Sequence, residues 1–211
     1  MKIESYDISV FLNCPFDDIY RPLFEVAVFT IIRCKFNVRC ALEESDSSEI
    51  RLYKIFRIIS ECKFGVHDLS MTELDIETNL PRFNMPFELG LFLSAKYFDN
   101  DQDKICLIFE KQPHTYEKYI SDIKGQDISS HNYNPQTLIK KMRDWLDTNS
   151  NHITLPGGSF LLKEYNQFQK WLPKRCKTLK LETTELTFNN YAQLVYEWIE
   201  INNPNDIILK Y

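Results

Sequence analysis

The sequence predicts an α/β protein in which helices cover both faces of a doubly wound parallel sheet. Short apolar runs with strand propensity alternate with longer helical segments through the first 148 residues. These runs are nearly continuous in apolar residues, as strands buried on both faces are. Hydrophobic residues make up 44% of the 211-residue chain, which is enough to bury a sizeable core.

The expected elements follow one another in a regular order. Strands are expected at residues 6–13, 37–42, 63–69 and 104–110. Helices are expected at residues 19–35, 49–62, 85–98 and 135–148. The segment VAVFTII within the first helix is strand-like by propensity alone, but the length of the segment and the early position of Pro22 favour a helix.

The repeated strand–helix units favour the flavodoxin-like strand order, with four or five strands and right-handed crossovers. After residue 148 the alternation stops and a turn-rich segment follows. Two amphipathic helices rich in aromatic residues are then expected at 159–172 and 187–202. The sequence therefore divides into an α/β domain over residues 1–148 and a C-terminal helical appendix over residues 149–211.

The charge and the cysteine pattern argue against a nucleic-acid-binding protein, a membrane protein and a zinc-finger protein. The chain carries 25 basic and 30 acidic residues, so its net charge of −5 offers no basic field for nucleic acid or an anionic membrane. The six cysteines include no CxxC pair and no zinc-finger spacing. The N-terminus shows no signal-peptide pattern, and no apolar run approaches about 20 residues. We therefore expect a cytoplasmic protein with reduced thiols that binds neither membrane nor nucleic acid.

Several common active sites lack their motifs in this sequence. A GxGxxG or GxxxxGK[ST] phosphate loop, a GxSxG elbow and an HExxH metal motif do not occur. Carboxylates are not clustered at metal-binding spacing either, so we expect neither a metal nor a resident cofactor. Chemistry performed by a carboxylate remains as the simplest alternative.

Ligands of open parallel sheets bind beyond the carboxyl ends of the strands. The first strand ends in NCPFDD, the third ends in His67-Asp68-Leu69-Ser70, and Glu88 lies on the helix that follows. We expect Glu88 and Asp68 to be the catalytic pair. The residues expected to contact the substrate are Asn13, Cys14, Phe16, Asp17, Arg39, Ser70 and Asn84.

Each of these residues also has a structural interpretation. Glu88, expected in the first turn of its helix, can stabilise the helix dipole or act on a ligand. Asp68 can cap a turn, and Asn13 and Asp17 can be turn or N-cap residues. Cys14 can be an inert buried thiol. Arg39 and Arg82 can form surface ion pairs or meet a phosphate.

The segments YDISVFLNCPFDD, GVHDLS and NMPFELGLFLSAKYF resemble the TIR-like and nucleoside 2-deoxyribosyltransferase-like superfamily, especially small bacterial TIR-like proteins associated with anti-phage defence. The similarity runs from about Tyr6 to Trp145, and FELGLFLSAK is its most specific element. The resemblance implies that Glu88 is the carboxylate that attacks or stabilises the sugar carbon, and that Asp68 orients the ligand. It also implies that NAD(P) or a nucleotide is the substrate and that the chain forms homo-oligomers.

Three functions are compatible with these patterns. The first is an enzyme that hydrolyses or exchanges an N-glycosidic bond of NAD(P), a nucleoside or a nucleotide. The second is a module that binds a nucleotide or assembles with other copies without chemistry. The third is a partner protein in which residues 150–211 carry the function.

Overall fold

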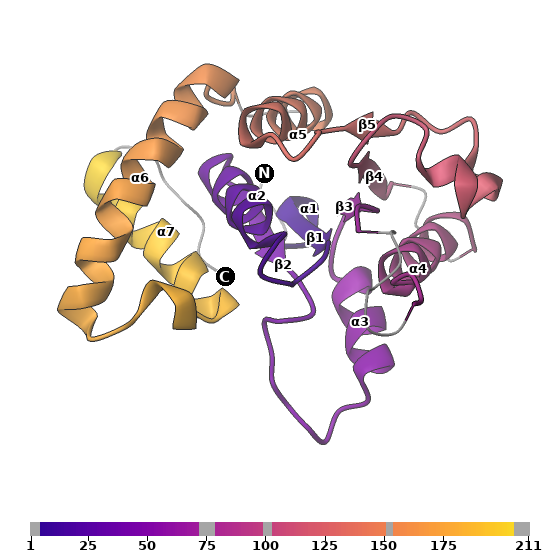
Figure 1. Cartoon of the computed structure of the whole chain (residues 1–211), viewed down its shortest axis with the longest axis horizontal. Helices are drawn as coiled ribbons and strands as arrows, with labels where there is room; N and C mark the ends of the chain where they lie inside the picture. The colour runs from indigo at the N-terminus through magenta and orange to yellow at the C-terminus, as the bar shows by residue number, and fades with distance from the viewer. Residues whose placement is uncertain (1–4, 72–78, 99–102, 151–153, 205–211) are drawn as a thin grey trace.

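The computed structural model describes residues 5–71, 79–98, 103–150 and 154–204, which form a five-stranded, all-parallel sheet flanked by helices (Figure 1). The strands are β1 (Ser9–Asn13), β2 (Asn37–Arg39), β3 (Phe64–Asp68), β4 (Ile105–Glu110) and β5 (Ser129–Ser130). Their order across the sheet is β2-β1-β3-β4-β5. The predicted α/β class and its flavodoxin-like order are therefore confirmed.

The α-helices are α1 (Ser5–Ile8), α2 (Arg21–Arg33), α3 (Arg51–Ser60), α4 (Asn84–Phe98), α5 (Pro135–Asn149), α6 (Gly158–Leu179) and α7 (Phe188–Asn202). Three short 3-10 helices lie at Tyr116–Lys118, Ser121–Ile123 and Thr183–Glu185. In the described part of the chain, no helix combines the length and apolar character that crossing a membrane requires.

Successive side chains of β1 point to opposite faces of the sheet, and each face has its own helices. Val10 and Leu12 belong to a large core that also contains the buried residues of α2 and α5. Phe11 packs instead with Ile58 of α3 and Phe92 of α4. The sheet is therefore covered on both sides, which explains why its strands are apolar at almost every position.

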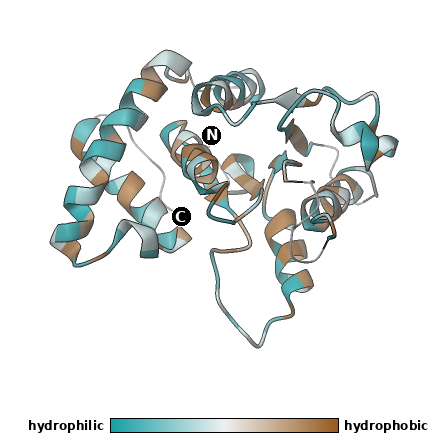
Figure 2. Cartoon of the chain, in the orientation of Figure 1, coloured by the Kyte–Doolittle hydropathy of each residue, from teal (hydrophilic) through white to brown (hydrophobic). Residues whose placement is uncertain are grey.

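Helix α2 is the central helix of the structure. Ten of its thirteen residues are buried, because the sheet lies on one side and α5, α6 and α7 lie on the others (Figure 1). Figure 2 shows the resulting contrast between the largely apolar α2 and the polar outer side of α6. The strand-like segment VAVFTII thus forms a helix that is apolar all round and buried, as such helices generally are.

Several element boundaries differ from the expectation. Residues 5–8 form a short helix, so the first strand begins at Ser9 rather than Tyr6. Helix α6 continues to Leu179, beyond Pro173, because Cys176 in its last turns is still buried against the core. Helix α4 begins at Asn84, which places Glu88 in its second turn. The expected position of Glu88 at the helix terminus is therefore wrong, and the helix dipole is not what stabilises its charge.

Candidate functional site

A cleft of about 540 Å³ opens beyond the carboxyl ends of β1 and β2. One wall is the loop after β1, with Phe16 and Asp18, and the opposite wall is the start of α3, with Arg51 and Lys54. Leu186, Thr187 and Phe188 at the start of α7 complete the cleft, so the C-terminal helices contribute to it. Its volume lies within the range of about 300–1,000 Å³ that is usual for small-molecule sites.

Glu88 does not line this cleft but lies next to Arg51, which does, and Glu88 is buried to 5% exposure. Within the described residues its one polar contact is with Arg51, whose Nη2 lies 3.8 Å from Oε1. Burial raises the pKa of Glu88 to about 6, and the Arg51 charge only partly opposes this effect. A buried carboxylate whose pKa is raised next to a cleft is a candidate for a reactive group.

Because the folded protein disfavours the Glu88 carboxylate, this residue should lower stability at neutral pH. The cost is absent below the unfolded pKa of about 4.3, grows as the pH rises, and is complete above about pH 6. We expect Glu88→Gln to stabilise the protein at pH 8 by about 2 kcal/mol and to have little effect near pH 4. Urea unfolding at the two pH values measures this difference, and an equal or destabilising effect at pH 8 would contradict the assigned environment.

Asp68 lies in a polar cluster buried at the end of β3. Its Oδ2 accepts a short hydrogen bond from the Tyr20 hydroxyl and lies 2.8 Å from Nε2 of His131, while Oδ1 accepts from the backbone N–H of Ser70 at 2.8 Å. Burial alone would raise the pKa of Asp68, but the contacts with His131, Ser70 and Tyr20 outweigh it and hold the pKa below its usual value. Asp68 thus ties the segments after β1, β3 and β5 together.

Ser70, His131 and Asp68 have the composition of a hydrolase triad but not its geometry. The Ser70 hydroxyl lies 3.2 Å from Nε2 of His131, the same nitrogen that contacts Asp68. The other nitrogen, Nδ1, accepts a hydrogen bond from the backbone N–H of Tyr133. No nitrogen of His131 is therefore left to take a proton from the serine, as a triad requires.

Removing the charge of Asp68 should weaken this cluster in a pH-dependent way. Because its folded pKa is lowered, its contribution is complete above about pH 4 and is lost as the pH falls through the folded value. We expect Asp68→Asn to destabilise the protein by about 1–3 kcal/mol at pH 7. The difference from the wild type should shrink towards pH 3, and chemical denaturation at both pH values tests it. A difference that is constant with pH would show that the carboxylate is not held by these donors.

Two residues at the end of β1 are buried beneath the cleft rather than within it. The Asn13 amide donates to the backbone carbonyl of Met85 at 2.9 Å and lies 3.0 Å from Nδ1 of His67. Burial lowers the pKa of His67 to about 3, so its ring is neutral. Burial also raises the pKa of the Cys14 thiol well above its usual value, which makes this cysteine unreactive.

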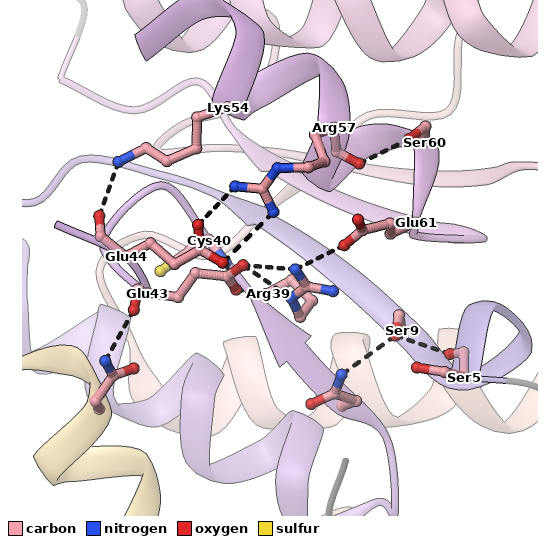
Figure 3. A network of polar contacts seen from close by, with 12 residues as sticks. Ser5, Ser9, Arg39, Cys40, Glu43, Glu44, Lys54, Arg57, Ser60 and Glu61 are labelled. Atoms are coloured by element: carbon pink, nitrogen blue, oxygen red, sulfur yellow. Dashed lines mark hydrogen bonds and ion pairs between the residues drawn. The ribbon is translucent and has the colours of Figure 1, made fainter. Parts of the chain in front are cut away.

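The charged candidates are held by other protein groups. Arg39 binds both oxygens of Glu43 and also contacts Glu61 at 2.8 Å (Figure 3). Asp17 accepts from the backbone N–H of Tyr20 and forms an ion pair with Arg82 at 2.7 Å. These contacts fix the loops around the cleft.

The remaining candidates lie at different depths. Phe16 is partly exposed and lines the cleft, whereas Ser70 is buried in the Asp68 cluster. Asn84 is exposed at the start of α4. Of the predicted site residues, Phe16 thus lines the cleft and Glu88 reaches it only through Arg51, whereas Asn13, Cys14, Ser70 and Asp68 are buried and do not line it.

Sequence reasoning missed three residues: Arg51, Tyr20 and His131. Arg51 could have been found, because it is the first residue of the helix after β2 and such helix starts also lie at the carboxyl edge. Tyr20 and His131 carry no comparable signal, since nothing in their local sequence indicates a contact with Asp68.

Among the described residues, no group of three or more His, Cys, Asp or Glu side chains converges in a way that would hold a metal ion. No protein-family model matches the chain, and no curated protein is significantly similar to it. A functional assignment therefore depends on the fold and on the chemistry of the cleft.

Proposed function

We propose that this protein cleaves or exchanges the N-glycosidic bond of NAD(P), a nucleoside or a nucleotide, with Glu88 as the reacting carboxylate. The observation that carries the proposal is the state of Glu88. Its side chain is buried, and its pKa is raised. Within the described residues its only polar contact is with the Arg51 guanidinium, which lies 3.8 Å away and lines the cleft. The resemblance of FELGLFLSAK to the deoxyribosyltransferase helix favours the same role, and by the same resemblance we propose a part in anti-phage defence.

The proposed chemistry uses the ionised form of Glu88. As the bond between C1′ and the base nitrogen breaks, its electron pair leaves with the base, and positive charge develops on the sugar. The carboxylate stabilises that charge or forms a bond to C1′. Water or an acceptor base then adds at C1′, and where Glu88 has bonded to C1′ that bond breaks and its electron pair returns to the carboxylate. In hydrolysis of NAD(P) the proton of water goes to solvent, because nicotinamide leaves as a neutral base, whereas the base that leaves a nucleoside or nucleotide takes up this proton. A poorly solvated carboxylate stabilises such a charge more effectively than one in water.

Arg51 supplies the connection between Glu88 and the cleft. Its side chain is about half exposed and holds Glu88 only loosely, so a ligand entering the cleft can displace it. Once displaced, the guanidinium can bind a phosphate of the ligand, and the Glu88 carboxylate becomes accessible to the sugar.

The proposal is tested by incubating the purified protein with NAD, NADP and individual nucleosides. Release of nicotinamide or free base is followed by chromatography, with and without an added acceptor base to detect exchange. Glu117→Gln serves as a control carboxylate, because it lies away from the cleft and pairs with His114 and Lys124. Release by the wild type and by this control supports the proposal. Absence of release from every substrate by the wild type would reject it.

A second candidate is a module that binds a nucleotide without chemistry. It is favoured by the engagement of Asp68, Asn13 and Arg39 with protein groups, which leaves these three expected site residues unavailable for a role in chemistry. Calorimetric titration with NAD and nucleotides, together with the assay of base release, distinguishes the binding module from the enzyme. Saturable binding without base release assigns the cleft to this second function.

A further inference from the structure

The outer side of α4 is apolar although it faces solvent. Its exposed positions follow a helical stripe with Phe83 just before the helix, then Phe87, Gly90, Ser94 and Tyr97. This spacing places all five on one side of the helix. Helix α2 is apolar as well, but the sheet and other helices cover it. No described element covers the exposed stripe of α4.

The neighbouring helix α3 continues the apolar surface. Tyr53 and Phe56 are exposed on α3, which packs beside α4 on the same face of the sheet (Figure 1). Two arginines of α3 adjoin this surface: Arg51 lies at its cleft end, and Arg57, whose side chain is 36% exposed, forms ion pairs with Glu44 and Glu49. We call this surface the α3–α4 face and define it by Tyr53, Phe56, Phe83, Phe87, Gly90, Ser94, Tyr97 and Phe98.

The outer faces of the other long helices are mostly polar, with single exposed apolar residues at Phe160 and Leu179 of α6 and at Ile201 of α7. The exposed stripe of α5 consists of Gln136, Lys140, Asp144 and Thr148. That of α6 includes Lys163, Lys170, Lys174 and Lys177. The apolar character of the α3–α4 face is therefore specific to this side of the molecule and is not a general property of its surface.

The α3–α4 face also contains a groove. A hollow of about 370 Å³ lies between the two helices, with Phe56, Arg57, Ile59 and Ser60 on one side and Leu91, Ser94 and Ala95 on the other. Gly90 and Ser94 have small side chains, so α4 does not protrude beside the groove. A Cβ atom added at Gly90 would meet no atom within 4 Å. A groove flanked by exposed aromatic side chains can accept an aromatic side chain from a facing surface.

The size of this face matches that of a stable interface. Its six aromatic side chains are between 43% and 83% exposed. Since a Phe or Tyr side chain can bury about 150–250 Å², together they present roughly 700 Å² of largely apolar area. The largest apolar patch of an ordinary monomer covers about 300–600 Å², whereas a standard interface buries about 800 Å² on each partner.

We propose that the α3–α4 face binds the same face of a second copy of this chain, forming a two-fold symmetric dimer. A two-fold contact is self-complementary, so each copy supplies both the exposed aromatic side chains and the groove that receives them. The Arg57 guanidinium at the groove is paired with Glu44 and Glu49, and the side chains that define the face are uncharged, so two identical faces would experience little repulsion. This inference goes beyond the proposed function, because it concerns a surface outside the cleft and does not depend on any reaction.

Light scattering coupled to size-exclusion chromatography over a dilution series tests the dimer. The decisive variant is Gly90→Glu, which places a charge at the centre of the face. Glutamate fits at this open position and is a better helix former than glycine, so the isolated chain should fold at least as well as the wild type. Gln136→Glu is the matched control, since it adds the same charge at an exposed position on the polar face of α5.

We expect the wild type and Gln136→Glu to have twice the mass of one chain, and Gly90→Glu to have the mass of one chain with an unchanged or higher melting temperature. If Gly90→Glu loses its circular-dichroism signal, Ser94→Glu at the neighbouring exposed position replaces it. A wild type that remains monomeric at its highest soluble concentration overturns the proposal. Sedimentation of that monomer with neutral lipid vesicles would assign the face to a membrane surface instead. A dimer that persists in both glutamate variants places the contact elsewhere and also overturns it.

Discussion

Replacing Glu88 by glutamine is expected to lower the rate of N-glycosidic bond cleavage by roughly 10³-fold or more. Glutamine keeps the shape of the side chain but cannot carry the negative charge that stabilises, or bonds to, the developing cation at C1′. Because the lost interaction is made in the transition state, kcat should fall while KM changes little. Initial rates of base release from the best substrate, measured for both proteins at pH 8, test this expectation.

The same substitution is expected to make the protein more stable at pH 8, since it removes an unfavourably buried charge. Loss of activity in Glu88→Gln therefore cannot be attributed to unfolding. The wild-type rate should rise with pH through about 6 as Glu88 ionises, and Glu117→Gln should follow the same profile. A Glu88→Gln protein that retains more than a tenth of the wild-type rate would show that this carboxylate is not the reacting group.

The second large effect is expected at the ion pair that joins α2 to α6. The Arg33 guanidinium donates to both oxygens of Glu164 at 2.8 and 3.2 Å, and both side chains are almost fully buried. Asn203 also donates to Glu164, at 3.0 Å. Removing one partner leaves the other as an uncompensated buried charge, so Arg33→Met alone should cost about 3–5 kcal/mol of folding free energy.

The double variant Arg33→Met with Glu164→Met should recover most of that loss, because apolar groups of similar length then replace both charges. A matched control is Arg175→Met, which removes an ion pair between α6 and α7 that is about one-third exposed. This control should cost only about 0–1 kcal/mol. Urea denaturation of the four proteins at pH 7 measures these differences. A small effect of Arg33→Met, similar to that of Arg175→Met, would contradict the role assigned to the buried pair.

The sequence predicted the architecture well because the strands and helices have strong periodic patterns. The helix over VAVFTII was predicted from its length and from Pro22, although its propensity favoured a strand, and its burial on all sides explains the conflict. Strand β5 has only two residues, Ser129 and Ser130, and is too short to leave a pattern. The end of α6 was misplaced because Pro173 commonly terminates a helix, whereas the burial of Cys176 here depends on packing that sequence periodicity does not show.

The site was predictable only in part, and the reason is geometric. The rule that ligands bind beyond the carboxyl ends of parallel strands points to the edge of the sheet where the cleft with Phe16 opens, and Glu88 lies next to Arg51 of that cleft. The rule does not say which polar side chains at that edge bind each other. Asp68 contacts Tyr20 and His131, which are 48 and 63 residues away in the sequence. Such contacts depend on how the loops fold back over the sheet, and no local pattern encodes them.

A crystal structure of the wild type with a non-cleavable NAD analogue would test the role of Glu88 most directly. We expect the ligand in the cleft beside Arg51, with the ribose C1′ about 3–3.5 Å from a carboxylate oxygen of Glu88. A ligand bound elsewhere, or one in the cleft whose C1′ remains out of reach of Glu88, would contradict the proposed chemistry.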